Sequence, residues 1–418
     1  MAKKNKPSSI KDILDNMSIS KIKAKMKADV EKSYDIRTIF EQMELDLISS
    51  MHKAFYYHKR EEAKEGFQFE QWQLTKLREL EKYRKRNTDI IGAYMPVIQE
   101  TIDRELINSY TQGENNVERL IDKAKNDIKE FNIEFPDDIS EKQATKDYIL
   151  GETSTPPADN NFFGVNEKKL KALTNSVKND LDKSKYSILR KMDDVYRQTI
   201  FKSQVYMQSG TKTLYQAIDM TTKDFLKQGI NSITYSNGKR VNISSYAEMC
   251  LRTANHRAML LGEGTKRDEF GIHLVVVSAH ANTCPMCEPW QGKVLIDDIF
   301  SHPSTDYIDK HKQYKKVSEA IDKGLLHPNC RHALITYFEG VTKIPVIPDG
   351  EKAIETYKTE QKQRAYERNI RRWKRIAEGS VDDNNKLDAI NKVKLYQTQL
   401  RKLLEEHTEL RRNYNRGE

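Results

Sequence analysis

Residues 272–278 read Ile-His-Leu-Val-Val-Val-Ser, residues 284–287 read Cys-Pro-Met-Cys, and residues 327–332 read His-Pro-Asn-Cys-Arg-His. A Cys-x-x-Cys turn brings two sulfur atoms close enough to share one tetrahedral ion, and a later His-x-x-Cys turn can supply the other two ligands. An ion bound in this way would brace the small domain around it, because metal-binding free energy becomes folding free energy. The predicted cofactor is therefore structural zinc. Its predicted ligands are Cys284, Cys287, His327 and Cys330.

Two other interpretations of these cysteines stay open from the sequence, namely buried free thiols and a redox pair. Redox Cys-x-x-Cys motifs normally stand at a strand-to-helix junction, whereas Pro289 and Gly292 follow this pair and disfavour a helix. We prefer zinc because histidines accompany the cysteines.

The identity of the histidine ligand is open as well. Residues 288–326 separate the two turns, which is a longer gap than in a zinc finger, so the spacing alone does not single out zinc. His332 could replace His327, and His280 is a third candidate. We prefer His327 because its spacing to Cys330 mirrors the spacing of the first pair.

The same residues carry a resemblance to a known family. Residues 284–294 read Cys-Pro-Met-Cys-Glu-Pro-Trp-Gln-Gly-Lys-Val, and with the 327–332 run this resembles the minor capsid proteins of tailed phages of Gram-positive bacteria. That family is more distantly similar to the Mu F-like head morphogenesis proteins. Further blocks of resemblance, which extend it over most of the chain, are Gly66–Gln73, Phe162–Gly164, Gln216–Asp219, Tyr246–Met249 and Arg252–Ala254.

The resemblance implies a structural role in head morphogenesis and capsid assembly. It implies a minor capsid protein in the interior of the phage head, present in a few copies per particle. The implied partners are the portal protein and other capsid or scaffold proteins, with packaged double-stranded DNA close by. Some relatives look as if they leave the head with the genome.

The composition fits long solvated helices around a modest core. Of the 418 residues, 37% are hydrophobic and 32% are charged, and the mean hydropathy is −0.79. The net charge of +9 permits contact with nucleic acid without requiring it. We expect neither a signal peptide nor a membrane anchor, because no sufficiently long apolar run occurs, and therefore expect synthesis in the reducing host cytoplasm.

Patterning divides the chain into helical and looped segments. Apolar residues at helical spacing, such as Ile36, Phe40 and Leu47, predict long amphipathic helices, and Pro96 predicts a kink or boundary in one of them. The predicted segments are a helical region 1–135, a linker 136–166, a helical region 167–230, an α+β Cys/His module 231–340, a linker 341–350 and a charged helical arm 351–418. The predicted fold class is α+β and predominantly helical, with long helical arms flanking a small zinc-braced module.

Within the predicted module, turn and strand signals alternate. Asn237-Gly238, flanked by β-branched residues, predicts a hairpin with a type I′ turn. We expect a helix that starts at Ser244 or Ser245 and runs to about Leu261, ended by Gly262-Glu263-Gly264. The remaining expected elements are strands at Ile272–Ser278, Lys293–Ile296 and Ala333–Tyr337, and a polar, partly helical insert at 297–324.

The C-terminal arm combines a basic run with an apolar seam. The predicted contact residues for nucleic acid or a protein partner are Arg364, Arg368, Arg371, Arg372, Trp373, Lys374 and Arg375. The predicted seam is Ile390, Val393, Leu400, Leu403, Leu404 and Leu410. Because an amphipathic helix is stabilised mainly by packing, we expect the arms to become fully ordered only against the portal or inner shell.

No catalytic constellation is evident, and we predict that the protein is not an enzyme. The sequence has no Gly-rich phosphate loop, nucleophile elbow or His-Glu-x-x-His motif, and a Cys/His ligand set is typical of closed structural sites. The alternative is a zinc-braced nuclease or toxin-like effector packaged in the head, since His327-Pro328-Asn329 loosely resembles part of a His-Asn-His nuclease site. A host nucleic-acid-binding protein is a third hypothesis.

Overall fold

The computed structural model describes residues 36–56, 69–134, 136, 138–157, 164–208, 214–230, 233–234, 238, 240–281, 283–328 and 330–410. These ranges are mainly helical with two small sheets, which confirms the predicted α+β, predominantly helical class. The described residues form two compact units, the first drawn from within the ranges 1–101, 180–248 and 363–418, and the second from within 102–179 and 249–362. Of the helices in the described ranges, none is long and apolar enough to cross a membrane.

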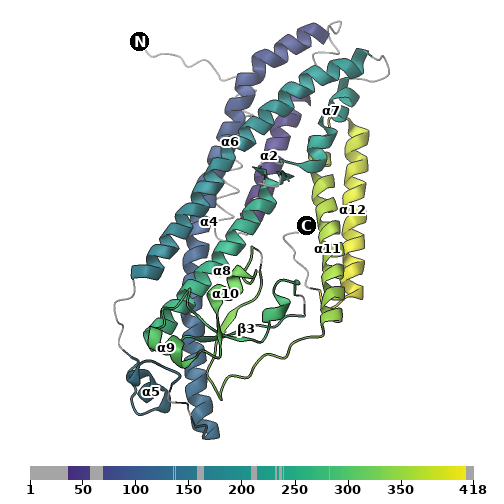
Figure 1. Ribbon diagram of the computed structural model, residues 1–418. Helices are drawn as coiled ribbons and strands as arrows, with labels where there is room; N and C mark the ends of the chain where they lie inside the picture. The colour runs from purple at the N-terminus through teal and green to yellow at the C-terminus, as the bar shows by residue number, and fades with distance from the viewer. Residues whose placement is uncertain are drawn as a thin grey trace, which may run out of the picture. The chain divides into compact units, whose positions relative to one another are not determined.

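The elements are labelled in Figure 1. The helices are α2 (Ile36–Tyr56), α4 (Phe69–Phe131), α5 (Gln143–Leu150), α6 (Gly164–Gln208), α7 (Leu214–Gln228), α8 (Ile243–Phe270), α9 (Thr305–Lys310), α10 (Val317–Asp322), α11 (Gly350–Gly379) and α12 (Asp383–Glu406), with a 3₁₀ turn η1 at Glu288–Trp290. The strands are β1 (Ile233–Thr234), β2 (Arg240–Val241), β3 (Leu274–Val277), β4 (Val294–Ile296), β5 (Lys315–Lys316) and β6 (Leu334–Thr336).

The core of the first unit is built from helix faces that the sequence predicted. The predicted apolar stripe of α2 is buried along its length, from Ile36 to Met51. Aromatic rings extend this core, because Tyr196 of α6 stacks on Tyr83 of α4 at 4.4 Å and on Phe55 of α2 at 5.1 Å. Phe55 is therefore part of the core of the first unit. Its aromatic neighbour Tyr57 lies outside the described residues.

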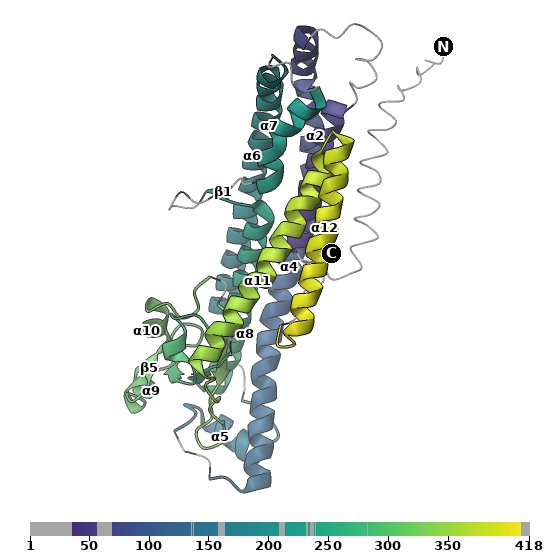
Figure 2. The ribbon, with the colours of Figure 1, turned by 90° about the vertical axis from the view of Figure 1, so that its right-hand side faces the viewer.

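The C-terminal helices of the first unit lie side by side, as both ribbon views show (Figures 1 and 2). Asp382 caps α12 by accepting hydrogen bonds from the backbone N–H groups of Asn384 and Asn385 at 3.1 Å. Asp219 of α7 accepts from the N–H of Val381 at 2.8 Å. Ile370 of α11 is fully buried within the first unit, so part of the arm packs against this chain itself, and the expected ordering by a partner stays a prediction.

The predicted hairpin is confirmed, but it does not belong to the module that we expected. Strands β1 and β2 pair antiparallel with Ile233 opposite Val241, and Gly238 between them has a φ of 78°. Asn237 lies outside the described residues. The hairpin is part of the first unit, whereas the other strands lie in the second.

The second unit contains a four-stranded sheet in the order β5-β4-β3-β6. Strand β3 pairs antiparallel with both β4 and β6, and all four of its residues are buried, which explains why its sequence is a continuous apolar run. The three predicted strands are confirmed. The insert 297–324 is partly helical, as predicted, but it also contains the unpredicted strand β5, which pairs parallel with β4.

One predicted helix stop is wrong, because α8 runs through Gly262 and Gly264 to Phe270. Helix α4 runs through Pro96, so Pro96 is not a boundary, and the kink predicted as the alternative stays a prediction. The glycines serve close packing instead of termination. A Cβ at Gly262 would lie 2.0 Å from the carbonyl oxygen of Tyr110, and a Cβ at Gly113 would lie 2.1 Å from that of Met259. The backbones of α4 and α8 therefore touch at a crossing that only glycine permits.

The segment 136–166 is not simply a linker, because α5 forms within it and packs into the second unit. Ile139 and Ile149 are buried in an apolar cluster with Ile121 of α4 and Phe270 of α8. The Ser140 hydroxyl donates to the carbonyl of Phe270 at 2.6 Å. The composition of residues 136–166 favoured a loop, but the buried side chains of Ile139 and Ile149 attach this segment to the apolar cluster. The blocks Phe162-Phe163 and Gly66–Gln68 lie outside the described residues.

Candidate metal centre

The sheet brings the two ligand-bearing turns together. Because β3 and β6 are antiparallel, the end of β3 lies beside the start of β6, where Val277 pairs with Leu334. The N–H of Ser278 donates to the carbonyl of Ala333 at 3.0 Å, just beyond the paired residues. The turn that follows β3 and the turn that precedes β6 therefore emerge at the same end of the sheet.

Both turns are internally hydrogen-bonded. The N–H groups of Cys287 and Glu288 donate to the carbonyl of Cys284 at 3.1 and 3.0 Å. The N–H of Cys330 donates to the carbonyl of His327 at 2.8 Å. These bonds make each pair a compact turn that holds its two side chains on one side, as a shared ion requires.

The side chains meet as two overlapping groups. One contains Cys284, Cys287 and His327, the other contains Cys287, Cys330 and His332, and within each group the ligand atoms lie within 4.8 Å of one another. The two groups share Cys287 and together contain the four residues predicted as ligands, with His332, which the sequence left as an alternative, as a fifth member.

Within each of the two groups, the separations between neighbouring ligand atoms are close to those around tetrahedral zinc. With Zn–S bonds of about 2.3 Å and Zn–N bonds of about 2.0 Å, tetrahedral geometry places two sulfur atoms about 3.8 Å apart and a sulfur and a nitrogen about 3.5 Å apart. The sulfur atoms of Cys287 and Cys330 are 3.7 Å apart. The Cys284 sulfur lies 3.2 Å from Nε2 of His327, and the Cys330 sulfur lies 3.6 Å from Nδ1 of His332.

The three candidate histidines are held differently. Nδ1 of His327 hydrogen-bonds to the carbonyl of Pro328 at 2.8 Å, which leaves Nε2 facing Cys284 as a free ligand atom. His280 instead has Nε2 between the Ser278 hydroxyl at 2.9 Å and the carbonyl of Arg331 at 3.0 Å, and it joins neither group.

His332 has hydrogen-bond partners that the sequence analysis did not identify. Its Nε2 lies 3.3 Å from Oε1 of Gln291 and 3.4 Å from the Thr283 hydroxyl, so Nδ1 is the atom left to face Cys330. Gln291 lies in the Pro-Trp-Gln-Gly-Lys run, and nothing in the neighbouring residues marks it as a partner of His332.

Hydrogen bonds favour a thiolate at Cys330, although burial opposes it. Cys287 is completely buried and Cys330 is 8% exposed, among apolar residues that include Trp290 and Leu334. The hydrogen bond with the Cys287 thiol lowers the pKa of Cys330 to about 3, and the same contact raises the pKa of Cys287. Partial burial opposes the change at Cys284, but hydrogen bonds from the N–H of Cys287 and from His327 bring its pKa below the usual value. Such a donor set fits a divalent ion, which binds cysteine as thiolate.

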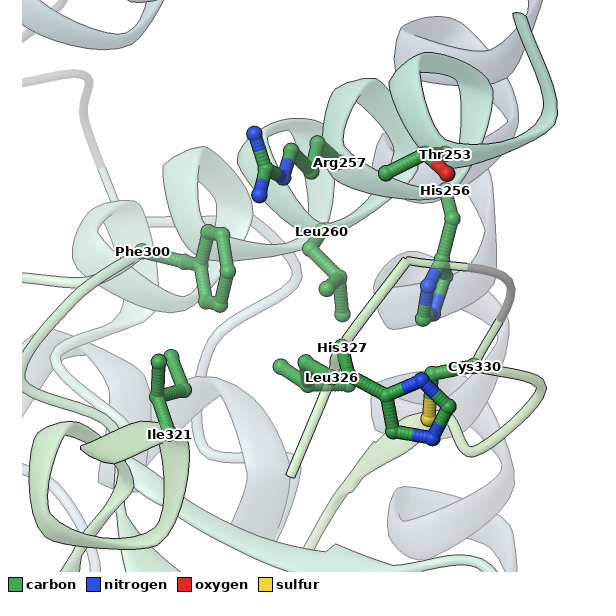
Figure 3. Close-up of a pocket in the computed structure, with 9 residues that line it drawn as sticks. All are labelled: Thr253, His256, Arg257, Leu260, Phe300, Ile321, Leu326, His327 and Cys330. Carbon is green, nitrogen blue, oxygen red and sulfur yellow. The ribbon is translucent and has the colours of Figure 1, made fainter. Parts of the chain in front are cut away.

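A small cavity of about 60 Å³ adjoins the centre. Figure 3 shows His327 and Cys330 on one side of it and Thr253, His256 and Arg257 of α8 on the other. These α8 residues are spaced so that they share one helix face. Burial lowers the pKa of His256, which keeps its imidazole neutral at pH 7.

The predicted contact residues of the C-terminal arm do not form one exposed basic patch. Arg375 is buried, lies 3.5 Å from Glu44 of α2, and donates to the carbonyl of Leu226 at 3.1 Å. Arg371 lies 3.4 Å from Glu41, and burial lowers its pKa to about 10. Arg371 and Arg375 lie four positions apart, which places both on the packed face of α11.

The other members of this run and the seam are divided between core and solvent. Arg368 is exposed, while Arg364, Arg372, Trp373 and Lys374 are half-buried. In the seam, Leu400 and Leu403 are buried, Ile390 is 38% exposed, and Val393, Leu404 and Leu410 are half-buried. The first unit itself therefore covers part of the predicted partner surface.

Comparison with known proteins gives consistent matches. The sequence model of the family described as "Phage minor capsid protein 2" matches residues 30–405. A "Structural protein" of Lactococcus phage LL-H is 27% identical over 227 residues, which are 53% of this chain and 61% of that protein. A "Structural protein" of Lactococcus phage mv4 is 36% identical over 97 residues, which are 22% of this chain and 79% of that protein. The chain thus spans less than two thirds of the LL-H protein. No solved structure matches the chain.

Proposed function

Because this chain belongs to the phage minor capsid protein 2 family, we propose that it acts inside the phage head as a structural, non-catalytic protein that contacts the portal. The observation that carries the proposal is the family match over residues 30–405. The name "Structural protein" of the two Lactococcus phage relatives supports a place in the virion. A basic net charge of +9 is compatible with a position beside packaged DNA and with exit alongside the genome.

The decisive experiment locates the protein in particles. Density-purified virions are cross-linked with a lysine-reactive reagent and the linked peptides are identified by mass spectrometry. Cross-links between this chain and the portal are expected, and the chain should resist protease while the head is closed. If it is absent from purified virions, or is digested from intact heads, the proposal is wrong.

The metal centre is proposed to brace the second unit without catalysing a reaction. Its candidate ligands are cysteine and histidine alone, and among the described residues no carboxylate joins either ligand group. Zinc would be held by Cys284, Cys287 and Cys330 with His327 or His332, and when bound it would supply only a fixed tetrahedral cross-link. This donor set gives the nuclease alternative no support.

The metal proposal is tested by elemental analysis of the purified full chain. About one zinc per chain is expected, and it should be lost from the double variant Cys284→Ser/Cys287→Ser. Cys250→Ser is the matched control, because Cys250 is also a cysteine outside any disulfide but lies on α8 outside both ligand groups. Full zinc retention by the double variant would refute the assignment.

A further inference from the structure

A second concavity on the second unit has an apolar floor. It has a volume of about 310 Å³ and contains Trp290, Met286 and two prolines, Pro285 and Pro289. Met286 is 51% exposed, although it lies between two candidate ligands in the Cys-x-x-Cys turn. The turn at Gly324 packs against its side chain, since a Cβ there would lie 3.3 Å from the Met286 sulfur. The floor is therefore formed by an exposed, flexible thioether and two exposed prolines, with a buried indole in the lining.

The rim of this hollow is basic. Lys293, Lys315 and Lys323 line it, all three are exposed, and no acidic residue is part of the lining. None of the three forms an ion pair with any carboxylate of the described residues. The ammonium groups of Lys293 and Lys315 lie 5.7 and 5.8 Å from the centroid of the Trp290 ring, close enough for a cation–π interaction. The tryptophan thus holds two uncompensated positive charges at the edge of an apolar floor.

The apolar floor and the basic rim together favour one class of binding partner over others. A nucleic-acid base has no ring on which to stack, because Trp290 is only 5% exposed and two lysines cover it. A phosphate backbone needs positive charge but gains nothing from an apolar floor. An acidic peptide with one large apolar side chain uses both features, since the side chain fills the hollow and the flanking carboxylates reach the lysines.

We propose that this hollow is a docking site for an acidic segment of another protein. One aliphatic or aromatic side chain of that segment would pack on Met286, Pro285 and Pro289, and its neighbouring carboxylates would pair with Lys293, Lys315 and Lys323. This docking proposal depends on the proposed role in assembly only to say where the partner protein comes from. Its test uses purified protein in solution, so a failure here leaves the location in the head untouched.

The test uses the full chain and a fluorescein-labelled Asp-Glu-Phe-Glu-Asp peptide, followed by fluorescence anisotropy at low salt. Two control peptides replace either Phe by Ala or every carboxylate by its amide. The variant Lys293→Gln/Lys315→Gln/Lys323→Gln should weaken binding at least about tenfold, since each exposed pair contributes a few-fold. The matched control Lys123→Gln/Lys168→Gln/Lys171→Gln removes the same charge from exposed positions elsewhere on this unit and should change binding less than about twofold.

The position of the anchor is tested by cross-linking. Replacing Phe in the peptide by benzoylphenylalanine, which photoreacts readily with methionine, should yield a cross-link to Met286. Saturable binding of the acidic peptide that is lost with each of the two control peptides, together with this cross-link, supports the proposal. It is overturned by no saturable binding, by equal loss in the two lysine variants, or by cross-links outside the hollow. It is also overturned if a DNA duplex binds through these lysines and the peptide does not displace it.

Discussion

Replacing Gly262 by alanine tests the helix crossing that organises the second unit. The new methyl group would lie 2.0 Å from the carbonyl oxygen of Tyr110 and 3.2 Å from the N–H nitrogen of Glu114, both backbone atoms of α4. No rotamer change relieves contact with a backbone. The helices must separate by about 1.4 Å to restore an ordinary contact of 3.4 Å.

The expected cost follows from two opposing terms. Overpacking costs about 1–3 kcal/mol, and a backbone-to-backbone clash belongs at the upper end of that range. Alanine in place of glycine inside a helix returns about 1 kcal/mol. Separation would also stretch the hydrogen bond between the hydroxyls of Tyr110 and Thr265, now 2.8 Å long. The net loss of stability should be about 2 kcal/mol.

Hydrogen exchange measures this loss locally. Amides of residues 258–266 should exchange about 30-fold faster in Gly262→Ala, which corresponds to about 2 kcal/mol of opening free energy. Gly92→Ala is the matched control, because Gly92 lies inside α4 with nothing within 4 Å of its added Cβ. That variant should be more stable by about 0.5–1 kcal/mol. If Gly262→Ala also slows exchange, α4 and α8 do not cross at this glycine.

Three further predictions concern other parts of the chain. Burial lowers the pKa of His273 to about 3. Between pH 6.5 and pH 3 the unfolded state therefore binds a proton that the folded state does not, and the stability of the folded state falls as the pH falls through that window. Urea unfolding should show a loss of about 3 kcal/mol in unfolding free energy from pH 7 to pH 4, and this loss should be absent in His273→Gln. Arg375→Ala should cost about 3 kcal/mol in chemical denaturation, because it removes the positive charge beside the buried carboxylate of Glu44, which then keeps only neutral hydrogen-bond donors among the described residues, Ile230 and Asn242. Exposed Arg368→Ala should change stability by less than about 0.5 kcal/mol. A stable Arg375→Ala variant with weakened DNA binding would restore the exposed-patch interpretation. Plasmid incubated with the protein and Mg²⁺ or Mn²⁺ should stay intact on a gel, and cleavage abolished by His327→Ala would favour the nuclease alternative.

Local patterns predicted the elements whose signals depend on the segment itself. Strand β3 was predictable because a strand buried on both faces must be continuously apolar, and the 274–277 run is. The paired Cys and His spacings likewise predicted side chains that the sheet brings within 4.8 Å in two groups. These features need no knowledge of which distant segment lies opposite.

The errors share a different cause, since each depended on a remote partner. Gly262 resembles a helix stop unless Tyr110 is known to lie against it. From the sequence alone, Arg375 resembles a solvated cation, because the sequence does not show that Glu44 of α2 lies beside it. The role of Gln291 beside His332 could not be read from its own neighbours in the sequence either. Tertiary contacts decided these three positions against their local preference.

The central place of β3 has a consequence for how this chain would behave after a single cut. The exposed residues Lys312 and Gln313, between α9 and β5, are accessible to trypsin-like or other proteases. A cut there would sever the connection between β4 and β6, yet both strands would keep their ladders to β3. The nicked molecule should therefore migrate as one species under native conditions and separate into two fragments only when the sheet is denatured.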